Sequence, residues 1–198
     1  MNNCYLDAEA VITFFRMTGR KHIFITGSRG SGKSHLVNNM LKHMSDSFNL
    51  LQSHRTDTPQ VVIKSNLVAD NKEFVIGVPR TSGINPASKG NNMIIIEDGF
   101  INCAIPAINT HLDTTPEKLF VIDELGYLES ACIPFQKAVE KLLDNSHVLA
   151  VIRKQSTEFL NRICNRKMFL LLILTAHLKR FLALLWLPVC QNVLALIS

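Results

Sequence analysis

Short apolar runs alternate along this chain with segments in which apolar residues recur at helical spacing. The runs that predict strands are His22–Thr26, Val61–Lys64, Phe74–Val78, Met93–Ile96, Leu119–Ile122 and Val148–Ile152. The segments that predict helices are 8–19, Ser34–Met44, Ile101–Leu112, Ile133–Leu143 and Thr157–Cys164. This alternation predicts an α/β fold with a mostly parallel sheet flanked by helices.

Two regions interrupt the alternation. Between Leu50 and Asn92 the pattern is weak, and the turn-rich segment Pro79–Asn92 predicts a mobile loop. From Met168 to Ser198 the chain has no Asp or Glu and is dominated by Leu, Ile, Phe and Val.

The apolar tail raises the question of a membrane span. Its runs Met168–Leu174 and Phe181–Val189 are each shorter than the roughly 20 apolar residues that cross a bilayer. His177, Lys179 and Arg180 separate the two runs. A buried strand and a helix are therefore favoured over a span.

The length suits a single domain, and the charge does not indicate a surface that binds nucleic acid. The 198 residues fit a single domain, with 1–21 as an N-terminal helical extension and 168–198 as an atypical apolar tail. The net charge of +5 comes from scattered Lys and Arg, so no nucleic-acid surface is indicated.

The five cysteines are far apart, which favours reduced thiols without a metal site. Met1–Ala10 contains Asp7 and Glu9 and lacks the features of a secretory signal. We therefore expect a cytoplasmic protein.

A glycine-rich loop follows the first predicted strand and precedes a predicted helix. It matches G-x-x-x-x-G-K-[ST], the P-loop pattern, at every fixed position. Its residues are Gly27, Ser28, Arg29, Gly30, Ser31, Gly32, Lys33 and Ser34. This context favours a phosphate-binding loop over a simple Gly-Ser turn.

The residue types in the loop suit a nucleoside triphosphate with Mg²⁺. Glycines permit the tight backbone path, and successive N–H groups and the helix dipole attract an anion. Lys33 can reach the β and γ oxygens, and the Ser34 hydroxyl is placed to bind Mg²⁺. Arg29 either touches phosphate or faces solvent.

An acidic pair ends the most apolar predicted strand. Asp123 and Glu124 follow Leu119–Ile122, at the carboxyl end where ligands sit in open α/β sheets. We expect Asp123, from a neighbouring parallel strand, to hold the Mg²⁺ shell. Glu124 points the other way and is the candidate general base. Alternatively, the two carboxylates only cap a helix or are solvated.

Three stretches can be compared with known proteins. They are the P-loop with its preceding Ile25-Thr26, the run Ile122–Glu129, and, more weakly, Ala104-Ile105-Pro106-Ala107 together with Asn165-Arg166-Lys167. In these stretches the chain resembles the thermophile-type, or cancer-related, nucleoside-triphosphatase family of small P-loop NTPases. The resemblance covers about His22 to Lys167.

The resemblance implies a RecA-like fold and Mg²⁺-dependent hydrolysis of ATP, GTP and other triphosphates. It also adds Gly126 to the nucleotide-binding set and points to Glu129. A turn glycine and a surface glutamate are the simpler interpretations of these two residues.

The chain departs from the family at two places. Val151-Ile152-Arg153 stands where the family usually reads Thr-Ile-Pro, and Arg153 would lie near the nucleotide, although an exposed arginine is the simpler interpretation. The family expects a closing strand and a charged helix after Lys167, whereas this chain has the acid-free tail. That abrupt change motivates the hypothesis of a truncated or frame-shifted end.

Three functions fit these residues. The first is an NTP hydrolase, with Lys33 and Glu124 as its catalytic residues and Ser34 and Asp123 as its Mg²⁺ ligands. The second is a small-molecule kinase, and the third is a non-catalytic nucleotide-binding module. An arginine that stabilises the transition state is not singled out among Arg29, Arg80, Arg153 and a partner's arginine.

Overall fold

The computed structural model describes residues 8–44, 48–80, 93–154, 156–166, 169–174 and 182–184. Its strands are β1 His22–Gly27, β2 Phe48–Arg55, β3 Val61–Ser65, β4 Phe74–Pro79, β5 Met93–Ile95, β6 Leu119–Leu125, β7 His147–Ile152, β8 Phe169–Leu174 and β9 Leu182–Leu184. Its helices are α1 Ala8–Thr18, α2 Lys33–His43, η1 Ala69–Asn71, α3 Glu97–Gly99, η2 Phe100–Ala104, α4 Ile105–Thr114, α5 Tyr127–Ala131, α6 Ile133–Asn145 and α7 Glu158–Cys164.

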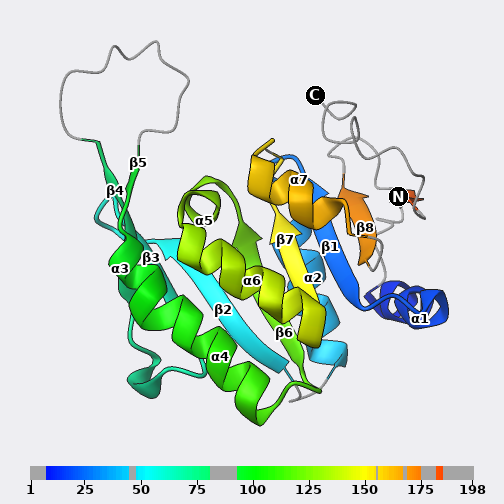
Figure 1. The fold of residues 1–198 in the computed structure, drawn as a ribbon. Coiled ribbons are helices and arrows are strands. Elements are labelled where there is room, and N and C mark those ends of the chain that lie inside the picture. Colours follow the sequence, from blue (N-terminus) through cyan, green and yellow to red (C-terminus); the bar gives the residue numbers. More distant parts are fainter. Residues whose placement is uncertain are drawn as a thin grey trace.

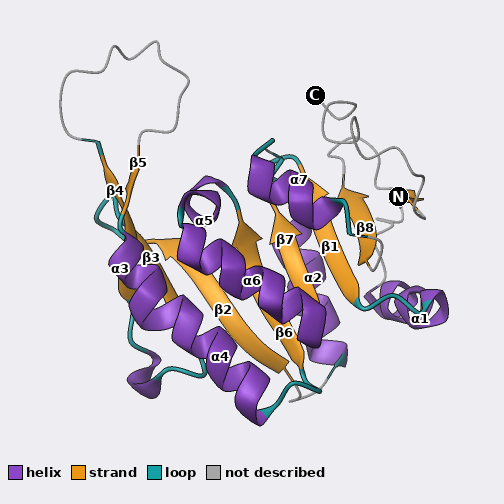
Figure 2. Cartoon of the chain, in the orientation of Figure 1, coloured by secondary structure: helices purple, strands orange, loops and turns teal. Residues whose placement is uncertain are grey.

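The described strands form one nine-stranded sheet in the order β5-β4-β3-β2-β6-β7-β1-β8-β9. Its centre, from β2 to β8, is parallel. Antiparallel strands β3, β4 and β5 extend one edge and β9 extends the other (Figures 1 and 2). The parallel centre is what the strand–helix alternation predicted.

Helices cover both faces of the sheet because its central strands are apolar on both sides. One core cluster packs β6 and β7 residues such as Phe120 and Ala150 against α4, α6 and α7. A second cluster packs Val121 and Leu149, their neighbours in sequence, against α1 and α2. Figure 1 shows α4, α6 and α7 on the near face and α2 behind the sheet.

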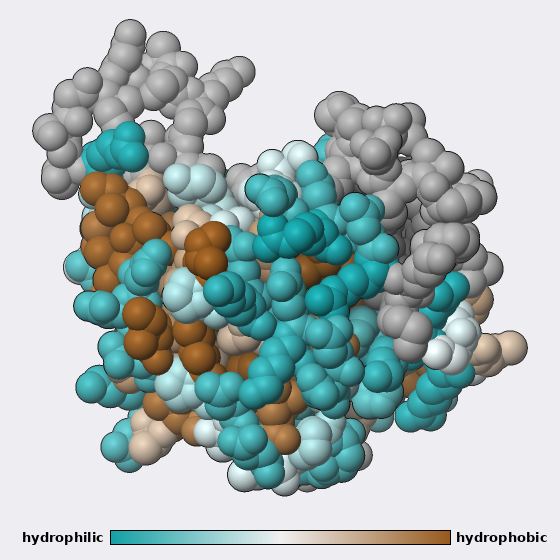
Figure 3. Space-filling view, in the orientation of Figure 1, coloured by the Kyte–Doolittle hydropathy of each residue, from teal (hydrophilic) through white to brown (hydrophobic). Residues whose placement is uncertain are grey.

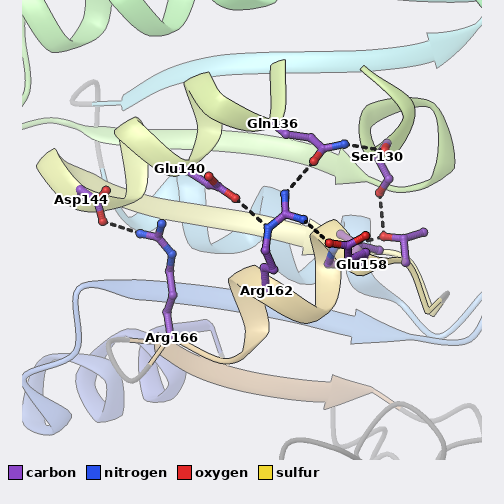
Figure 4. Close-up of polar contacts among 9 residues, drawn as sticks. Ser130, Gln136, Glu140, Asp144, Glu158, Arg162 and Arg166 are labelled. Atoms are coloured by element: carbon purple, nitrogen blue, oxygen red, sulfur yellow. Dashed lines mark hydrogen bonds and ion pairs between the residues drawn. The ribbon is translucent and has the colours of Figure 1, made fainter. Parts of the chain in front are cut away.

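Polar contacts bind α7 and the segment after it to α6 (Figure 4). The Arg162 guanidinium donates to Glu140 Oε1 at 3.1 Å, Glu158 Oε1 at 3.2 Å and Gln136 Oε1 at 2.8 Å. Arg166 pairs with Asp144 one turn further along α6. These contacts hold the chain after β7 in place.

Several elements differ from the expectation. Strand β2 lies in the region where the apolar pattern is weak, because the polar residues Asn49 and Gln52 interrupt its apolar positions. The helix expected at Ile101–Leu112 is longer and includes the π-helical turn η2 before Pro106. Because proline lacks the N–H that an α-helix would use, such a local change of hydrogen bonding accommodates it.

The tail supplies a buried strand as expected, while the expected helix falls largely on residues outside those that the structure describes. Strand β8 pairs with β1 over six residue pairs from His22↔Phe169 to Gly27↔Leu174. Within Phe181–Val189, Leu182–Leu184 is the strand β9 rather than a helix. The loop predicted at Pro79–Asn92 lies, after Arg80, outside the described residues.

The near surface is polar over α6 and α7 and more apolar around β4, β5 and the α3–α4 helix (Figure 3). Exposed isoleucines include Ile94, Ile101 and Ile133. Across the described residues, no helix combines the length and the apolar character that crossing a membrane requires.

Candidate nucleotide-binding site

The predicted loop joins β1 to α2 as the motif requires. Strand β1 is buried along its whole length, and α2 begins at Lys33. Gly30 and Gly32 have φ values of +76° and +91°, in the left-handed region that favours glycine. A Cβ at either position would meet no atom within 4 Å. Backbone conformation, rather than crowding within the chain, therefore explains these two glycines.

Lys33 is folded back over the loop. Its Nζ donates to the carbonyl oxygens of Gly27 at 2.9 Å and Ser28 at 2.8 Å. Burial lowers the Lys33 pKa, with Glu124 acting in the opposite direction and Arg153 reinforcing the decrease. The ammonium group thus lies within electrostatic reach of the acidic strand end.

Two hydroxyl groups at the loop are buried without a hydrogen-bond partner among the described residues. They belong to Thr26, the last residue but one of β1, and to Ser31 inside the loop. A buried hydroxyl without a partner costs about 1–3 kcal/mol. A phosphate oxygen bound in the loop would give Ser31 an acceptor. Ser34, Ser28 and Arg29 are exposed.

Asp123 lies two strands from the loop, because β7 separates β6 from β1. The strand that carries Asp123 is parallel to β1, as expected, but it is not adjacent to β1. At about 4.8 Å per strand, the two strand axes are roughly 10 Å apart. Asp123 Oδ1 accepts the Ser53 backbone N–H at 2.9 Å. Burial raises the Asp123 pKa to about 7, while the Ser53 hydrogen bond opposes the shift.

Glu124 is paired with Arg153, which follows the intervening strand β7. The Arg153 Nε contacts Glu124 Oε1. The two side chains are 48% and 34% exposed, so the pair is open to solvent. Arg153 is exposed, as the simpler interpretation expected, and it is also paired with Glu124.

Gly126 and Glu129 form the start of α5. Glu129 Oε2 accepts the Gly126 N–H at 2.9 Å. Glu129 is buried, and burial raises its pKa to about 7. The interpretation of Glu129 as a surface residue is wrong, because its carboxylate serves as an acceptor inside the molecule.

A cavity of about 120 Å³ opens beside Glu124, on the side of the sheet that carries β2 and β3. Its lining combines polar and apolar side chains, and none of the loop residues 27–34 contributes to it. The lining residues are Ser53, His54, Arg55, Val61, Met93, Glu124, Tyr127, Leu128, Glu129 and Arg153.

The candidate Mg²⁺ ligands are hard oxygen donors, which suits this ion. Ser34 offers a hydroxyl and Asp123 a carboxylate, and the ion usually keeps waters and phosphate oxygens as its other ligands. The described residues contain no group of three or more His, Cys, Asp or Glu that could hold a metal ion by themselves.

The fold and the loop define a P-loop protein of the α/β class. A family model described as NTPase matches residues 22–182. The chain therefore belongs to this NTPase family. The match continues beyond Lys167 and includes β8, which pairs with β1.

Two relatives from Thermotoga are named nucleoside-triphosphatase THEP1. The protein of strain RQ2 is 26% identical over 146 residues, which are 73% of this chain and 80% of the relative. The Thermotoga maritima protein is 23% identical over 145 residues, with the same two coverages.

Two solved structures share the fold. The crystal structure of THEP1 from Aquifex aeolicus has a TM-score of 0.61 and 20% identity, covering 79% of this chain and 91% of that one. The solution structure of a human cancer-related nucleoside triphosphatase has a TM-score of 0.55 and 18% identity, covering 76% and 87%. At these identities the two structures show that this chain shares their fold.

Proposed function

We propose that this chain hydrolyses nucleoside triphosphates, including ATP and GTP, to the diphosphate and phosphate with the help of Mg²⁺. The observation that carries the proposal is that two basic side chains and one carboxylate lie together at the carboxyl ends of β1, β6 and β7. Lys33 follows the first of these strands, Glu124 belongs to the second and Arg153 follows the third.

Binding begins at the loop. The N–H groups of Gly27–Ser34 and the amino end of α2 receive the phosphates. Lys33 then exchanges the carbonyl oxygens of Gly27 and Ser28 for the β and γ oxygens. Gly126 belongs to the same proposed set because it matches the family motif, and its lack of a Cβ leaves room for the Arg153 side chain close to Glu124.

Ser34 and Asp123 would hold Mg²⁺, which neutralises charge on the β and γ oxygens when it is bound. Glu124 accepts a proton from the water that attacks the γ phosphorus. The bond between the γ phosphorus and the β–γ bridging oxygen breaks, and the nucleoside diphosphate leaves. The proposed setting for this reaction is the cytoplasm, in keeping with the buried, free thiols of Cys103 and Cys132.

Phosphate release from ATP, GTP, CTP and UTP tests the proposal. We expect Mg²⁺-dependent turnover that Lys33→Ala and Glu124→Gln each reduce by roughly 100-fold or more, since both remove groups from the reacting centre. Glu124→Gln should still bind nucleotide. Tight, Mg²⁺-dependent binding by the wild type without any phosphate release would contradict hydrolysis.

A small-molecule kinase is the second candidate, and the cavity beside Glu124 is the observation that favours it. The cavity lies away from the loop and combines apolar residues such as Val61 and Leu128 with His54 and Arg55. A phosphate acceptor bound there would take the place of the attacking water. Negligible hydrolysis that becomes rapid nucleotide consumption when a small-molecule acceptor is added would favour this candidate.

A further inference from the structure

Arg153 occupies the position between the phosphate loop and the acidic strand end. It follows β7, which pairs with β1 on one side and with β6 on the other. Its backbone N–H donates to the Leu125 carbonyl oxygen at 2.9 Å, which fixes the start of its side chain beside Glu124.

The other arginines considered from the sequence are placed less favourably. Arg80 follows β4, five strand positions from β1, a separation of about 24 Å at the usual strand spacing. Arg29 is exposed within the loop itself, whereas Arg153, although also exposed, is held beside the acidic strand end by its ion pair with Glu124. Arg153 is therefore the arginine whose strand lies next to β1.

The chain makes room for Arg153 at Gly126. A Cβ on Gly126 would lie 2.9 Å from Arg153 Cδ and 3.5 Å from Glu124 Oε1. A larger residue at this position would require the Arg153 side chain to shift. The glycine of the motif therefore permits the contact between Arg153 and Glu124.

The ion pair between Arg153 and Glu124 is weak enough for Arg153 to change partners. Both partners are partly exposed, and such pairs contribute little stability because water and ions compete with them. Arg153 also reinforces the lowering of the Lys33 pKa, so its charge is felt at the loop. A triphosphate bound at Lys33 would bring a larger negative charge within the same region.

We propose that Arg153 changes partners, pairing with Glu124 when the site is empty and with the γ-phosphate when a nucleoside triphosphate is bound. The empty site thus keeps its base neutralised by an ion pair. Arrival of the γ-phosphate draws the guanidinium away, which frees Glu124 to accept the proton of the attacking water. The inference rests on the proposed function and gives it a residue that distinguishes triphosphate from diphosphate.

Calorimetric binding of a non-hydrolysable ATP analogue and of ADP, each with Mg²⁺, tests the exchange. For Arg153→Ala we expect the preference for the triphosphate to fall roughly 10- to 100-fold, the usual effect of losing a hydrogen bond to a charged group. ADP affinity should change less than about threefold. Arg153→Lys should restore part of the preference, since it keeps the charge but loses the planar donor group.

Arg55→Ala is the matched control. Arg55 lines the same cavity and also carries a positive charge, but it lies on β2. This variant should keep the wild-type preference, which would separate a specific contact from a general loss of positive charge.

Glu124→Gln tests the partner exchange itself. Without the competing carboxylate, Arg153 should bind the γ-phosphate more readily, and the triphosphate preference should rise about twofold to fivefold, the strength of an exposed ion pair. In the double variant Arg153→Ala/Glu124→Gln this gain should disappear. An unchanged preference in Arg153→Ala, or an equal gain in the double variant, would overturn the inference.

The binding experiment tests the Arg153 contact, and the phosphate-release assay tests the proposed hydrolysis, so either proposal can be contradicted without the other. Loss of triphosphate preference in Arg153→Ala, with no phosphate release by the wild type, supports the Arg153 contact and contradicts hydrolysis. Normal hydrolysis that depends on Glu124, with an unchanged preference in Arg153→Ala, supports the function and overturns the inference.

Discussion

Asp123 and Glu124 are consecutive residues with different surroundings. The Asp123 carboxylate accepts a backbone N–H from β2, and burial raises its pKa to about 7. The Glu124 carboxylate is partly exposed and pairs with Arg153 after β7. In the proposed reaction Asp123 holds the metal ion and Glu124 accepts the proton.

Asp123→Asn tests the metal role. The amide oxygen can still accept the Ser53 N–H, so we expect the free energy of unfolding to change by less than about 1 kcal/mol. Activity should fall roughly 100-fold or more, because an amide is a weaker Mg²⁺ ligand. Phosphate release as a function of Mg²⁺ concentration provides the measurement, with exposed Asp113→Asn as the control. Unaltered Mg²⁺ dependence in Asp123→Asn would argue against the assignment.

Glu129 gives a pH-dependent prediction. Its folded-state pKa of about 7 lies above the usual value of 4.5, so the folded state binds more protons between these pH values. Stability from this group therefore decreases as pH rises from about 4.5 to 7, by at most about 3 kcal/mol. Glu129→Gln removes the titration, so the stability of this variant relative to wild type should increase across that range.

Urea unfolding at pH 5 and pH 8 measures the effect. Glu129→Ala is the contrasting variant, since it leaves the Gly126 N–H without its acceptor and should cost about 2 kcal/mol. Identical pH dependence in the wild type and Glu129→Gln would show that Glu129 does not titrate in this way.

At the level of elements, a buried network ties α4 to β2 and to the start of β7. Asn49 Nδ2 lies 2.8 Å from His111 Nδ1, and His111 Nε2 lies 2.7 Å from Ser146 Oγ. Ser146 Oγ in turn donates to the Pro116 carbonyl oxygen at 2.8 Å. Ser146 Oγ must therefore accept a hydrogen bond from His111, so the imidazole proton lies on Nε2. The network explains how β2 can be an inner strand despite its buried asparagine.

His111→Ala should destabilise the fold without affecting the candidate site. The imidazole is fully buried and packs edge-on against Phe120, with ring centroids 4.9 Å apart. Its loss leaves a cavity and an unpaired amide hydrogen on Asn49, together costing about 3 kcal/mol. Nucleotide affinity at low temperature should be unchanged, because the network lies at the amino ends of the strands.

Chemical denaturation measures this cost, and His111→Gln is the matched variant. A glutamine amide offers both an acceptor and a donor, so part of the stability should return. A cost below about 1 kcal/mol for His111→Ala would mean that the network contributes little.

For the whole molecule, the sheet continues on the far side of the loop-bearing strand. Strand β8 pairs with β1 along its full length, and β9 pairs with β8. Both strands come from the acid-free part of the chain, which therefore takes part in the fold next to the P-loop. Leu172 on β8 is fully buried in the cluster that includes α1 and α2.

Leu172→Ala tests the contribution of β8. Truncating a fully buried leucine costs about 3 kcal/mol when the cavity does not collapse, and we expect unfolding at a correspondingly lower denaturant concentration. Ile101→Ala is the control, because Ile101 is 46% exposed and should cost less than about 1 kcal/mol. Equal effects of the two substitutions would argue against a buried β8.

Much of the fold follows from local patterns. The apolar runs that became β1, β6 and β7 and the helical spacing of α1, α2 and α6 were recognisable because burial on defined faces imposes a period. Strand β2 was missed since Asn49 is satisfied only by groups on distant segments. The short strand β9 depends on pairing with β8, which local spacing does not encode.

The sequence by itself determined the phosphate loop, the acidic strand end and the α/β class, since each depends on residue types at short spacing. Tertiary structure alone decided that β7 separates Asp123 from the loop, that Glu129 is buried and that Arg153 meets Glu124. These facts depend on strand order and on contacts between residues far apart in the chain. Such contacts leave no periodic signal in a single sequence.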